Sequence, residues 1–386
     1  MIPYGRQDIT QDDIDAVTAA LTSDFITQGP AIAAFETAVA SSCGAAGGVA
    51  VTSATAGLHI AYMALGIGPG SLVWTVPNTF AATANAALYC GAEVDFVDID
   101  LQTRNLSVTA LAAKLEAADR AGRLPDLVVP VHFSGLACDM AGVGALARRY
   151  GFRVVEDASH AIGASDGPDK VGACRHSDAT VFSFHPVKII TTGEGGLITS
   201  ADPEIVATCA RLRTHGITRE ADRLEREADG PWYYEMHELG FNYRMTDIQA
   251  ALGASQMTRL EAYVTARNAL AARYEQAFAG LGLGLPVDRA DAVSARHLYT
   301  IHWPEGLGGH TRRSAFEAMR AQGLGVNVHY IPVHRLPFYE RRGFTPGMFP
   351  AAEAHYDQAI SLPMFPTMTA DECATVIRIV TELATA

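Results

Sequence analysis

Short apolar runs alternate with segments of helical spacing along the first 200 residues or so of the chain. The runs are nearly continuous and rich in β-branched residues, as is typical of strands buried on both faces. They cover residues 48–53, 72–77, 93–99, 127–133, 153–158, 179–184 and 196–200. Alanine-rich segments between them, such as TAGLHIAYMALG, TFAATANAALYCGA and MAGVGALARRYG, predict helices. This order predicts an α/β fold with a mainly parallel seven-stranded sheet flanked by helices.

The pattern changes after about residue 200. Residues 214–230 are charged and loop-like, and a single long helix is predicted from Thr246 to about Gly280. The rest of the chain mixes helices and prolines with two predicted strands, LYTIHW and GVNVHYI. We therefore expect a large domain over residues 1–255 and a smaller C-terminal α+β domain over residues 256–386.

Composition narrows the classes of partner. The 29 Lys and Arg residues against 42 Asp and Glu residues give a net charge of −13, which argues against nucleic acid or an anionic membrane. The six cysteines form no C-x-x-C pair, so neither a disulfide framework nor a metal site is expected. The N-terminus has no signal-peptide pattern, and no apolar run reaches the roughly 18 residues of a membrane helix. These features predict a cytoplasmic protein that acts on a small molecule or another chain.

The segment FSFHPVKIITTGEGGLI places Lys188 between an apolar strand and a loop rich in glycine and hydroxyl groups. A lysine that is partly desolvated in such a place has a lowered pKa and can form a Schiff base with an aldehyde. A solvated loop lysine is an equally good interpretation of this segment alone.

A carboxylate and an anion site are suggested by two other strand ends. Asp157 ends the apolar strand of RVVEDASHAIGA, where it either pairs with the protonated ring nitrogen of a cofactor or caps a helix. His160 lies close by as a cofactor contact or a packed core residue. In VTSATAGLHIA, a strand passes through Ser53, Ala54 and Thr55 into a helix, and backbone amides at such a helix start suit a phosphate.

Several motifs in fixed order together resemble one family. TSATAGL, PNTF, VEDASHA, SFHPVK with TTGEGG, and LGFNYRMTDIQAALG are similar to the DegT-family sugar-nucleotide aminotransferases, which are fold-type I pyridoxal-phosphate enzymes. The similarity covers nearly the whole chain, from IPYGRQDI to NVHYIPVHRLPFY. Within the family, the sequence most resembles the transaminases of pseudaminic acid biosynthesis, which act at C4 of a UDP-linked 4-keto-6-deoxy-N-acetylhexose.

The resemblance assigns roles to residues around pyridoxal 5′-phosphate. It implies that Lys188 is the Schiff-base lysine and Asp157 the partner of the pyridinium nitrogen, so that these two are the catalytic pair. The resemblance also implies that Phe80 stacks on the cofactor ring and that His160 contacts the ring oxygen. It places the phosphate-binding turn at Ser53, Ala54 and Thr55, with Ser183 as a second hydroxyl that reaches the phosphate. Asn242 corresponds to an asparagine that the neighbouring subunit supplies.

Substrate positions follow from the same resemblance. They lie near the N-terminus, beside the lysine and near the end of the chain, at Tyr4, Asp24, Phe25, Ile26, Thr27, His185, Asn327, Val328, His329 and Tyr330. The family further implies L-glutamate as the amino donor, a UDP-linked keto sugar as the acceptor, and a homodimer with shared active sites. Two alternatives stay open: the same chemistry on another nucleotide-linked keto sugar, of perosamine type or with a 3-keto group, and a regulator that binds the cofactor or a sugar without turnover.

Overall fold

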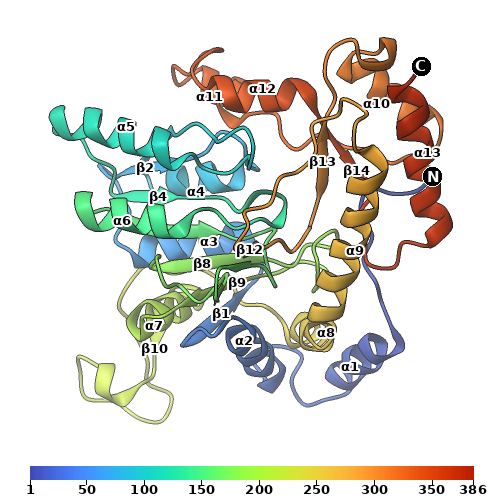
Figure 1. Ribbon diagram of the computed structural model, residues 1–386. Helices are drawn as coiled ribbons and strands as arrows, with labels where there is room; N and C mark the ends of the chain where they lie inside the picture. Colours follow the sequence, from blue (N-terminus) through green and yellow to red (C-terminus); the bar gives the residue numbers. More distant parts are fainter.

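Seven strands form the central sheet of the protein in a computed structural model that describes residues 1–386 (Figure 1). The strand order is β1-β9-β8-β5-β4-β2-β3. The strands are β1 (Gly47–Val51), β2 (Leu72–Thr75), β3 (Glu93–Phe96), β4 (Leu127–Val129), β5 (Arg153–Asp157), β8 (Ala179–Ser183) and β9 (Gly196–Ser200). Each coincides with one of the seven predicted runs. Only β9 runs antiparallel to its neighbours β8 and β1, so the predicted mainly parallel sheet is confirmed.

Helices cover the sheet and lead into it. They are α1 (Gln11–Leu21), α2 (Pro30–Cys43), α3 (Ala54–Ala64), α4 (Ala82–Tyr89), α5 (Val108–Arg120), α6 (Met140–Tyr150) and α7 (Pro203–Leu212). Short ladders lie outside the sheet: β12 (Ala292–Val293) pairs with β6 (Ser165–Asp166), which pairs with β7 (Asp169–Lys170), and β10 (Ile217–Thr218) pairs with β11 (Glu235–Met236). The charged segment 214–230 forms, with the residues up to 239, an arm that projects from the body at the lower left of Figure 1.

The prediction of one helix from Thr246 to Gly280 is wrong in one respect. The structure has two helices, α8 (Asp247–Met257) and α9 (Leu260–Phe278), with a break at Thr258 and Arg259. The Arg259 guanidinium donates to Asp13 of α1 at 2.7 Å, and α8 packs against α1 and α2 whereas α9 packs against α13 (Ala370–Ala384). The two halves have different packing partners, so the chain turns between them.

The C-terminal part is built on the antiparallel pair β13 (Tyr299–His302) and β14 (Ala359–Leu362). Its helices are α10 (Arg312–Ala321), α11 (Pro337–Glu340), α12 (Pro350–Gln358) and α13. One apolar cluster joins α9, β13, β14, α10 and α13, whereas Val333, Tyr339 and Phe349 pack into the core of the large sheet. The C-terminal residues therefore contribute to two cores, and the division of the chain at residue 255 stays a prediction.

The predicted strand GVNVHYI is not a regular strand. Asn327 pairs with Ser361 of β14 through two backbone hydrogen bonds of 3.2 and 2.7 Å, and the Gly325 N–H donates to the Ile2 carbonyl at 2.7 Å. The backbone then leaves the edge of β14, and residues 327–330 line a cavity instead. The apolar alternation in the sequence predicted strand pairing, but in the tertiary structure residues 327–330 line the cavity.

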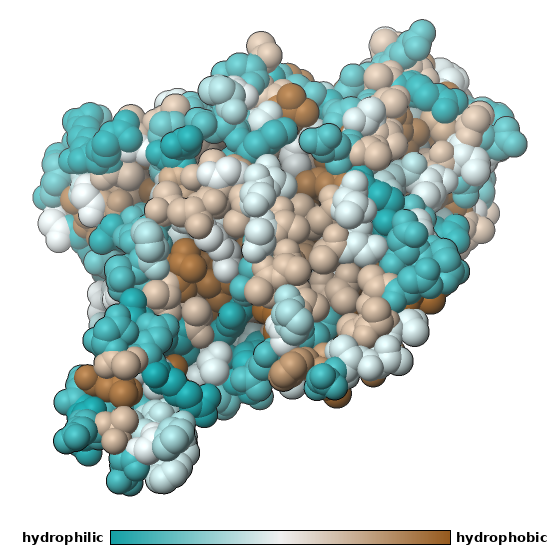
Figure 2. All heavy atoms as spheres, turned by 90° about the horizontal axis from the view of Figure 1, so that it is seen from below, coloured by the Kyte–Doolittle hydropathy of each residue, from teal (hydrophilic) through white to brown (hydrophobic).

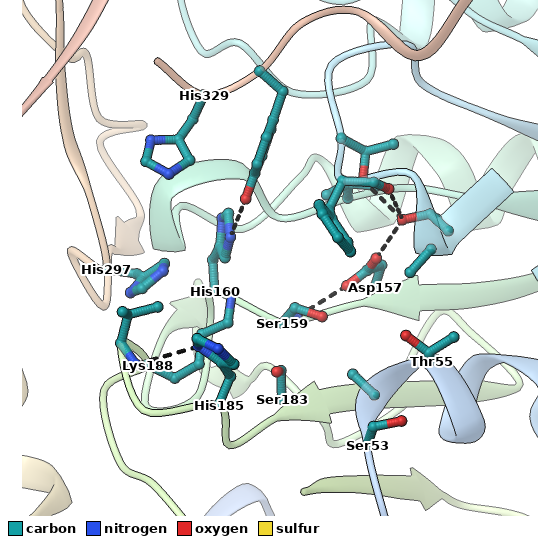
Figure 3. Close-up of a pocket in the computed structure, with 18 of the residues that line it drawn as sticks. Ser53, Thr55, Asp157, Ser159, His160, Ser183, His185, Lys188, His297 and His329 are labelled. Atoms are coloured by element: carbon teal, nitrogen blue, oxygen red, sulfur yellow. Dashed lines mark hydrogen bonds between the residues drawn. The ribbon is translucent and has the colours of Figure 1, made fainter. Parts of the chain in front are cut away.

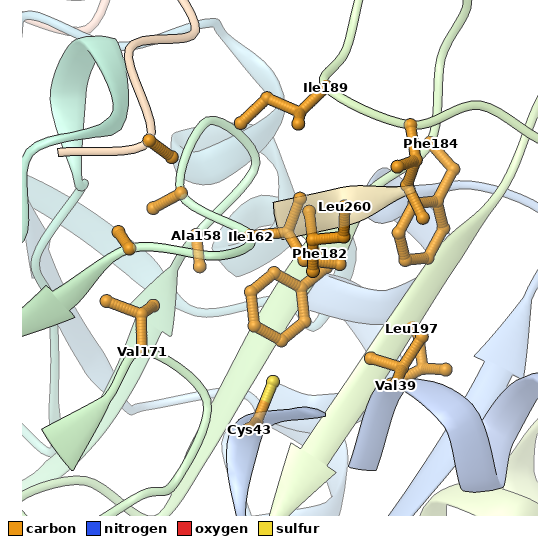
Figure 4. Close-up of a cluster of buried hydrophobic side chains, with 14 of the residues drawn as sticks. Val39, Cys43, Ala158, Ile162, Val171, Phe182, Phe184, Ile189, Leu197 and Leu260 are labelled. Carbon is orange, nitrogen blue, oxygen red and sulfur yellow. The ribbon is translucent and has the colours of Figure 1, made fainter. Parts of the chain in front are cut away.

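Buried side chains hold the ends of the strands in place. Phe182 of β8 and Phe184, which directly follows β8, pack into a cluster with Val39, Cys43 and Leu260 (Figure 4). Ser183 lies between them in the sequence, and because successive side chains of a strand point to opposite faces, it faces the other way. The same packing therefore directs Ser183 toward the cavity at the carboxyl end of the sheet.

Candidate active site

A cavity of about 760 Å³ lies at the carboxyl ends of β1, β5 and β8. Loops that follow these strands supply one side of it, and residues 297 and 327–330 supply the other (Figure 3). Ligand sites of parallel α/β sheets form at such strand ends. Fourteen of the residues predicted for the site line this one cavity: Tyr4, Ser53, Ala54, Thr55, Phe80, Asp157, His160, Ser183, His185, Lys188, Asn327, Val328, His329 and Tyr330.

Asp157 is the last residue of β5 and is only 5% exposed. The Thr83 hydroxyl donates to its Oδ2 at 2.7 Å, and the backbone N–H of Ser159 donates to its Oδ1 at 3.0 Å. No arginine, lysine or histidine forms a salt bridge with this carboxylate. Because a carboxylate has about four acceptor sites, both oxygens can still accept a donor from the cavity. The residue thus fits a protonated ring nitrogen.

Lys188 lies in the loop between β8 and β9, and its Nζ makes no hydrogen bond within the chain. Burial disfavours the ammonium form and lowers the pKa of Lys188 from 10.5 to about 8, although the charge of Asp157 opposes this shift. A lysine with such a pKa is partly neutral near pH 8 and can act as a nucleophile and as a base. The half-buried position of Lys188 in the cavity wall favours the Schiff-base lysine over a solvated loop lysine.

Ser53 caps the N-terminus of α3 and begins an anion site. Its Oγ accepts the backbone N–H of Ala56 at 3.2 Å, while the amides of Ala54 and Thr55 have no partner within the chain. A Cβ at Gly196 would lie 2.5 Å from the carbonyl carbon of Ser53, so only glycine allows β9 to approach this turn. Free amides at the positive end of a helix bind a phosphate. The cavity therefore has a phosphate site beside Ser183.

Phe80 and His160 also line the cavity. Phe80 is 65% exposed and lines the cavity, so its ring can cover a planar ligand. His160 accepts the Ser134 backbone N–H at Nδ1, and its Nε2 lies 2.9 Å from the Tyr330 hydroxyl. Burial, reinforced by the charge of Lys188, lowers the pKa of His160 well below its usual value. The imidazole is neutral and is held between the two halves of the site.

These residues fit pyridoxal phosphate as a set. The cavity offers an amine for the aldehyde, a carboxylate for the ring nitrogen, a helix N-terminus for the phosphate and an aromatic ring for stacking. The carboxylate and the unpaired amides are the decisive observations, because Asp157 keeps acceptor sites and the amides of Ala54 and Thr55 keep N–H donors that a ligand can pair with.

Five predicted site residues lie outside the cavity of their own chain. Residues 24–27 are exposed, Thr27 forms a bridge with Thr246, and Asn242 is exposed and forms a bridge with Thr214. The resemblance had assigned Asn242 to the site of a neighbouring subunit. Residues 24–27 and Asn242 therefore belong to a different surface from the cavity described here.

The cavity is also lined by residues that were not predicted from the sequence, among them Thr83, Ser159, Glu194 and His297. Thr83 had a signal: it stands one helical turn after Thr79, at the start of a helix that follows a strand. His297 had none, since it precedes an ordinary strand and reaches the cavity only because β13 packs beside the large domain.

Similarity to known proteins covers almost the entire chain. A model of the DegT/DnrJ/EryC1/StrS aminotransferase family matches residues 7–381. The chain is 38% identical over 385 residues to the spore coat polysaccharide biosynthesis protein SpsC of Bacillus subtilis, covering 99% of this chain and 97% of that protein. It is also 38% identical over 345 residues to a UDP-4-amino-4,6-dideoxy-N-acetyl-beta-L-altrosamine transaminase of Campylobacter jejuni, covering 88% of this chain and 86% of that protein.

A solved structure with the same fold is Helicobacter pylori PseC, an aminotransferase involved in the biosynthesis of pseudoaminic acid. The two chains superpose with a TM-score of 0.88 at 26% identity, and 99% of each chain is covered.

Proposed function

The chain belongs to the DegT/DnrJ/EryC1/StrS aminotransferase family, and we propose that it moves the amino group of L-glutamate to C4 of a UDP-linked 4-keto-6-deoxy-N-acetylhexose. The product would be UDP-4-amino-4,6-dideoxy-N-acetyl-altrosamine, an intermediate of pseudaminic acid biosynthesis. At the coarser level the protein is a sugar aminotransferase that uses pyridoxal phosphate.

One observation carries the assignment of a working enzyme: Lys188 and Asp157 line the same cavity, the lysine with a lowered pKa and the carboxylate without a cationic partner. A regulator without turnover would have no need of both. The Campylobacter transaminase and PseC support the choice of sugar. SpsC, which is as similar and is covered more completely, favours the alternative of the same chemistry on another nucleotide-linked keto sugar.

The residues of the cavity divide the work between them. Pyridoxal phosphate, when bound, supplies an electron sink and carries the amino group between the two substrates. Asp157 holds the ring nitrogen in its protonated state, and Ser53, Thr55 and Ser183 bind the phosphate. The Lys188 amine moves a proton away from the α carbon of the donor and later delivers one at C4 of the acceptor. Phe80 would stack on one face of the ring, hold it in position and exclude water from that face.

A panel of acceptors tests the choice of substrate. The purified protein, first converted to its amino form with L-glutamate, is mixed with UDP-linked 4-keto-6-deoxy-N-acetylhexose, a GDP-linked 4-keto sugar and a dTDP-linked 3-keto sugar. We expect the UDP-linked sugar to discharge the amino form fastest. A faster reaction with either other sugar would replace the proposed substrate, and no exchange with L-glutamate or any other amino acid would overturn the aminotransferase.

We further propose a homodimer in which Asn242 completes the partner's site. Exposed apolar side chains outside the cavity support this: Phe25 and Ile26 are 54% and 53% exposed, and Trp232, Met236 and Leu239 of the projecting arm are 70%, 62% and 75% exposed. Apolar groups also appear on the knob at the lower left of Figure 2, in teal surroundings. So much exposed apolar area is typical of a subunit interface.

Mixed dimers test this arrangement. Lys188→Ala and Asn242→Ala subunits are each expected to be weak alone, and mixing them would restore one complete site per heterodimer. We expect the mixture to recover up to a quarter of wild-type activity, since half of the dimers are mixed and each has one intact site. No recovery with exchanging subunits would contradict a shared site.

A further inference from the structure

Two histidines share the side of the cavity on which Lys188 lies. His297 and His329 are 4% and 7% exposed, line the cavity and are close enough for the charge of Lys188 to affect both. In Figure 3 they lie on the same side as Lys188, opposite Asp157 and Thr55. The proposed function leaves His297 without a role.

A chain of two hydroxyl groups determines which ring nitrogen of His329 carries the proton. The oxygens of Thr300 and Ser361 are 2.9 Å apart, and Ser361 Oγ lies 2.8 Å from Nδ1 of His329. Thr300 is fully buried, and its hydroxyl has no other acceptor within the chain. Both hydroxyl protons are used only if Thr300 donates to Ser361 and Ser361 donates to Nδ1. The ring proton is then on Nε2, the nitrogen that has no partner in the chain.

Burial of one ring nitrogen determines which nitrogen of His297 carries the proton. Its Nδ1 is buried without a hydrogen-bond partner, and its ring packs against His160 with 4.5 Å between centroids. A buried N–H that lacks a partner is rarer than a buried acceptor that lacks one. The proton is therefore on Nε2, which makes no hydrogen bond within the chain and is not among the buried unpaired atoms. Both rings thus direct an N–H donor into the cavity.

Both imidazoles stay neutral. Burial, together with the charge of Lys188, lowers the pKa of His329 to about 3 and that of His297 well below its usual value. Two neutral donors next to a lysine suit a ligand group of one negative charge, because two further cations there would repel the lysine.

The amino donor must place such a group at this point. Its nitrogen approaches the position of Lys188 Nζ, and its α-carboxylate is attached to the same carbon as that nitrogen. None of the residues of the same chain that line the cavity is an arginine, so this chain does not itself supply the usual bidentate partner of a carboxylate. The keto sugar has no carboxylate near its reacting carbon.

We propose that the Nε2–H groups of His297 and His329 together bind the α-carboxylate of the amino donor, one to each oxygen. This rests on the proposed aminotransferase function and adds the site that selects the donor. His297 is then a binding residue of the donor half-reaction alone.

The test compares L-glutamate with L-isoglutamine, in which the α-carboxylate is an uncharged amide. The apparent affinity of each is measured by the absorbance change of the loaded protein, and calorimetry with 2-methyl-L-glutamate, which has no hydrogen at the α carbon, gives binding without turnover. In His297→Phe, we expect binding of L-glutamate and of 2-methyl-L-glutamate to weaken about 10- to 100-fold, the range for a hydrogen bond to a charged group. The affinity for isoglutamine should change less than about threefold.

Further variants separate binding from packing. Phenylalanine keeps the ring against His160, and His297→Gln places an amide N–H near the position of Nε2, so it should regain part of the affinity for L-glutamate. His329→Phe should show the same selectivity for the carboxylate. His310→Phe, at a half-buried histidine outside the cavity, is the matched control and should bind L-glutamate as wild type does.

The second half-reaction separates this proposal from the function itself. Discharge of the amino form by the keto sugar should change less than about threefold in His297→Phe, since the sugar has no carboxylate for it to bind. If His297→Phe lost affinity for L-glutamate and isoglutamine equally, or for neither, the carboxylate site would be overturned while the aminotransferase function would stand. A wild-type protein that exchanges with no amino acid would overturn both.

Discussion

Two buried carboxylates follow one another on β5, and their surroundings differ. Glu156 is 4% exposed and receives three side-chain donors: His132 Nε2 at 2.7 Å, Thr180 Oγ1 at 3.1 Å and the Ser177 hydroxyl. Asp157 is 5% exposed and receives two donors, with acceptor sites left for the cavity. Both are equally hidden from solvent, so burial alone does not distinguish a structural carboxylate from one that binds a ligand. Incomplete pairing does.

The imidazoles show the same contrast. His132 accepts the Cys138 backbone N–H at Nδ1 and donates to Glu156 at Nε2, so both ring nitrogens have protein partners. Burial raises the pKa of Glu156, but hydrogen bonds from His132, Ser177 and Thr180 outweigh it and keep the pKa below its usual value. His329 keeps one ring nitrogen without a protein partner, and His297 keeps both. The cluster around Glu156 is closed, whereas the cavity is built to be completed by ligands.

Replacing Lys188, which lines the cavity, should have the largest effect on amine transfer. Lys188→Ala removes the covalent anchor and the proton carrier, so amine transfer should fall by about 10⁴-fold or more. Mass spectrometry after borohydride reduction should find the cofactor attached to the wild-type chain and not to the variant. The chain has only three lysines, and Lys170→Ala, at an exposed position, is the control. Substantial turnover by Lys188→Ala would contradict the assignment.

A crossed pair of substitutions tests the comparison directly. Asp157→Asn should lower turnover about 10²- to 10³-fold, because the ring nitrogen loses its charged partner, while the free energy of unfolding changes by about 1 kcal/mol or less. Glu156→Gln should cost about 3 kcal/mol of stability, because an amide NH₂ group would face the donors around it. Folded Glu156→Gln protein should keep near-normal turnover. Urea unfolding and steady-state rates measure both, and an effect of both substitutions on the same quantity would contradict the distinction.

The pH dependence of stability gives a smaller signal from Lys188. Its pKa is lowered in the folded chain from 10.5 to about 8, so between these pH values the unfolded chain binds the proton more strongly. Stability due to this group therefore rises from pH 8 to pH 10.5 and is constant below pH 8. Without cofactor, Lys188→Met should be more stable than wild type at pH 7, and the gap should narrow as the pH rises. Thermal unfolding of both proteins at pH 7, 8.5 and 10 measures the gap, and a constant gap would show that Lys188 is not desolvated.

The smallest expected effects come from the threonines that donate to the two carboxylates. Thr83→Val removes a donor from Asp157 and should lower turnover about tenfold, the value of one ordinary hydrogen bond. Thr180→Val removes a donor from Glu156 and should cost about 1 kcal/mol of stability without changing turnover. Chemical denaturation and rates with saturating L-glutamate distinguish the two. A loss of turnover in Thr180→Val would show that the closed cluster influences the cavity.

Much of the fold was predictable because local patterns specify it. All seven strands of the central sheet came from apolar runs, and Ser53, Asp157, Ser183 and Lys188 stand at or just after strand ends, where sequence order alone locates them. The break at Thr258 was not predictable. No proline or glycine marks it, and it depends on Arg259 meeting Asp13, which is far away in the sequence.

The other side of the cavity shows the same limit. His297 and residues 327–330 reach the site through the packing of β13 and β14 beside the sheet. GVNVHYI has the alternation of a strand, and only its neighbours decide that it is a wall.

The sequence by itself determined which strand ends carry the functional residues: a phosphate-binding turn follows one strand, a carboxylate ends another and a lysine follows a third. It also determined the family, because these motifs recur in fixed order. The tertiary structure decided which buried polar groups are closed and which are open. Glu156 and Asp157 are neighbours of similar chemistry, and only contacts with residues distant in the chain make one structural and leave the other free for a ligand. Such contacts depend on three-dimensional packing, which local patterns do not encode.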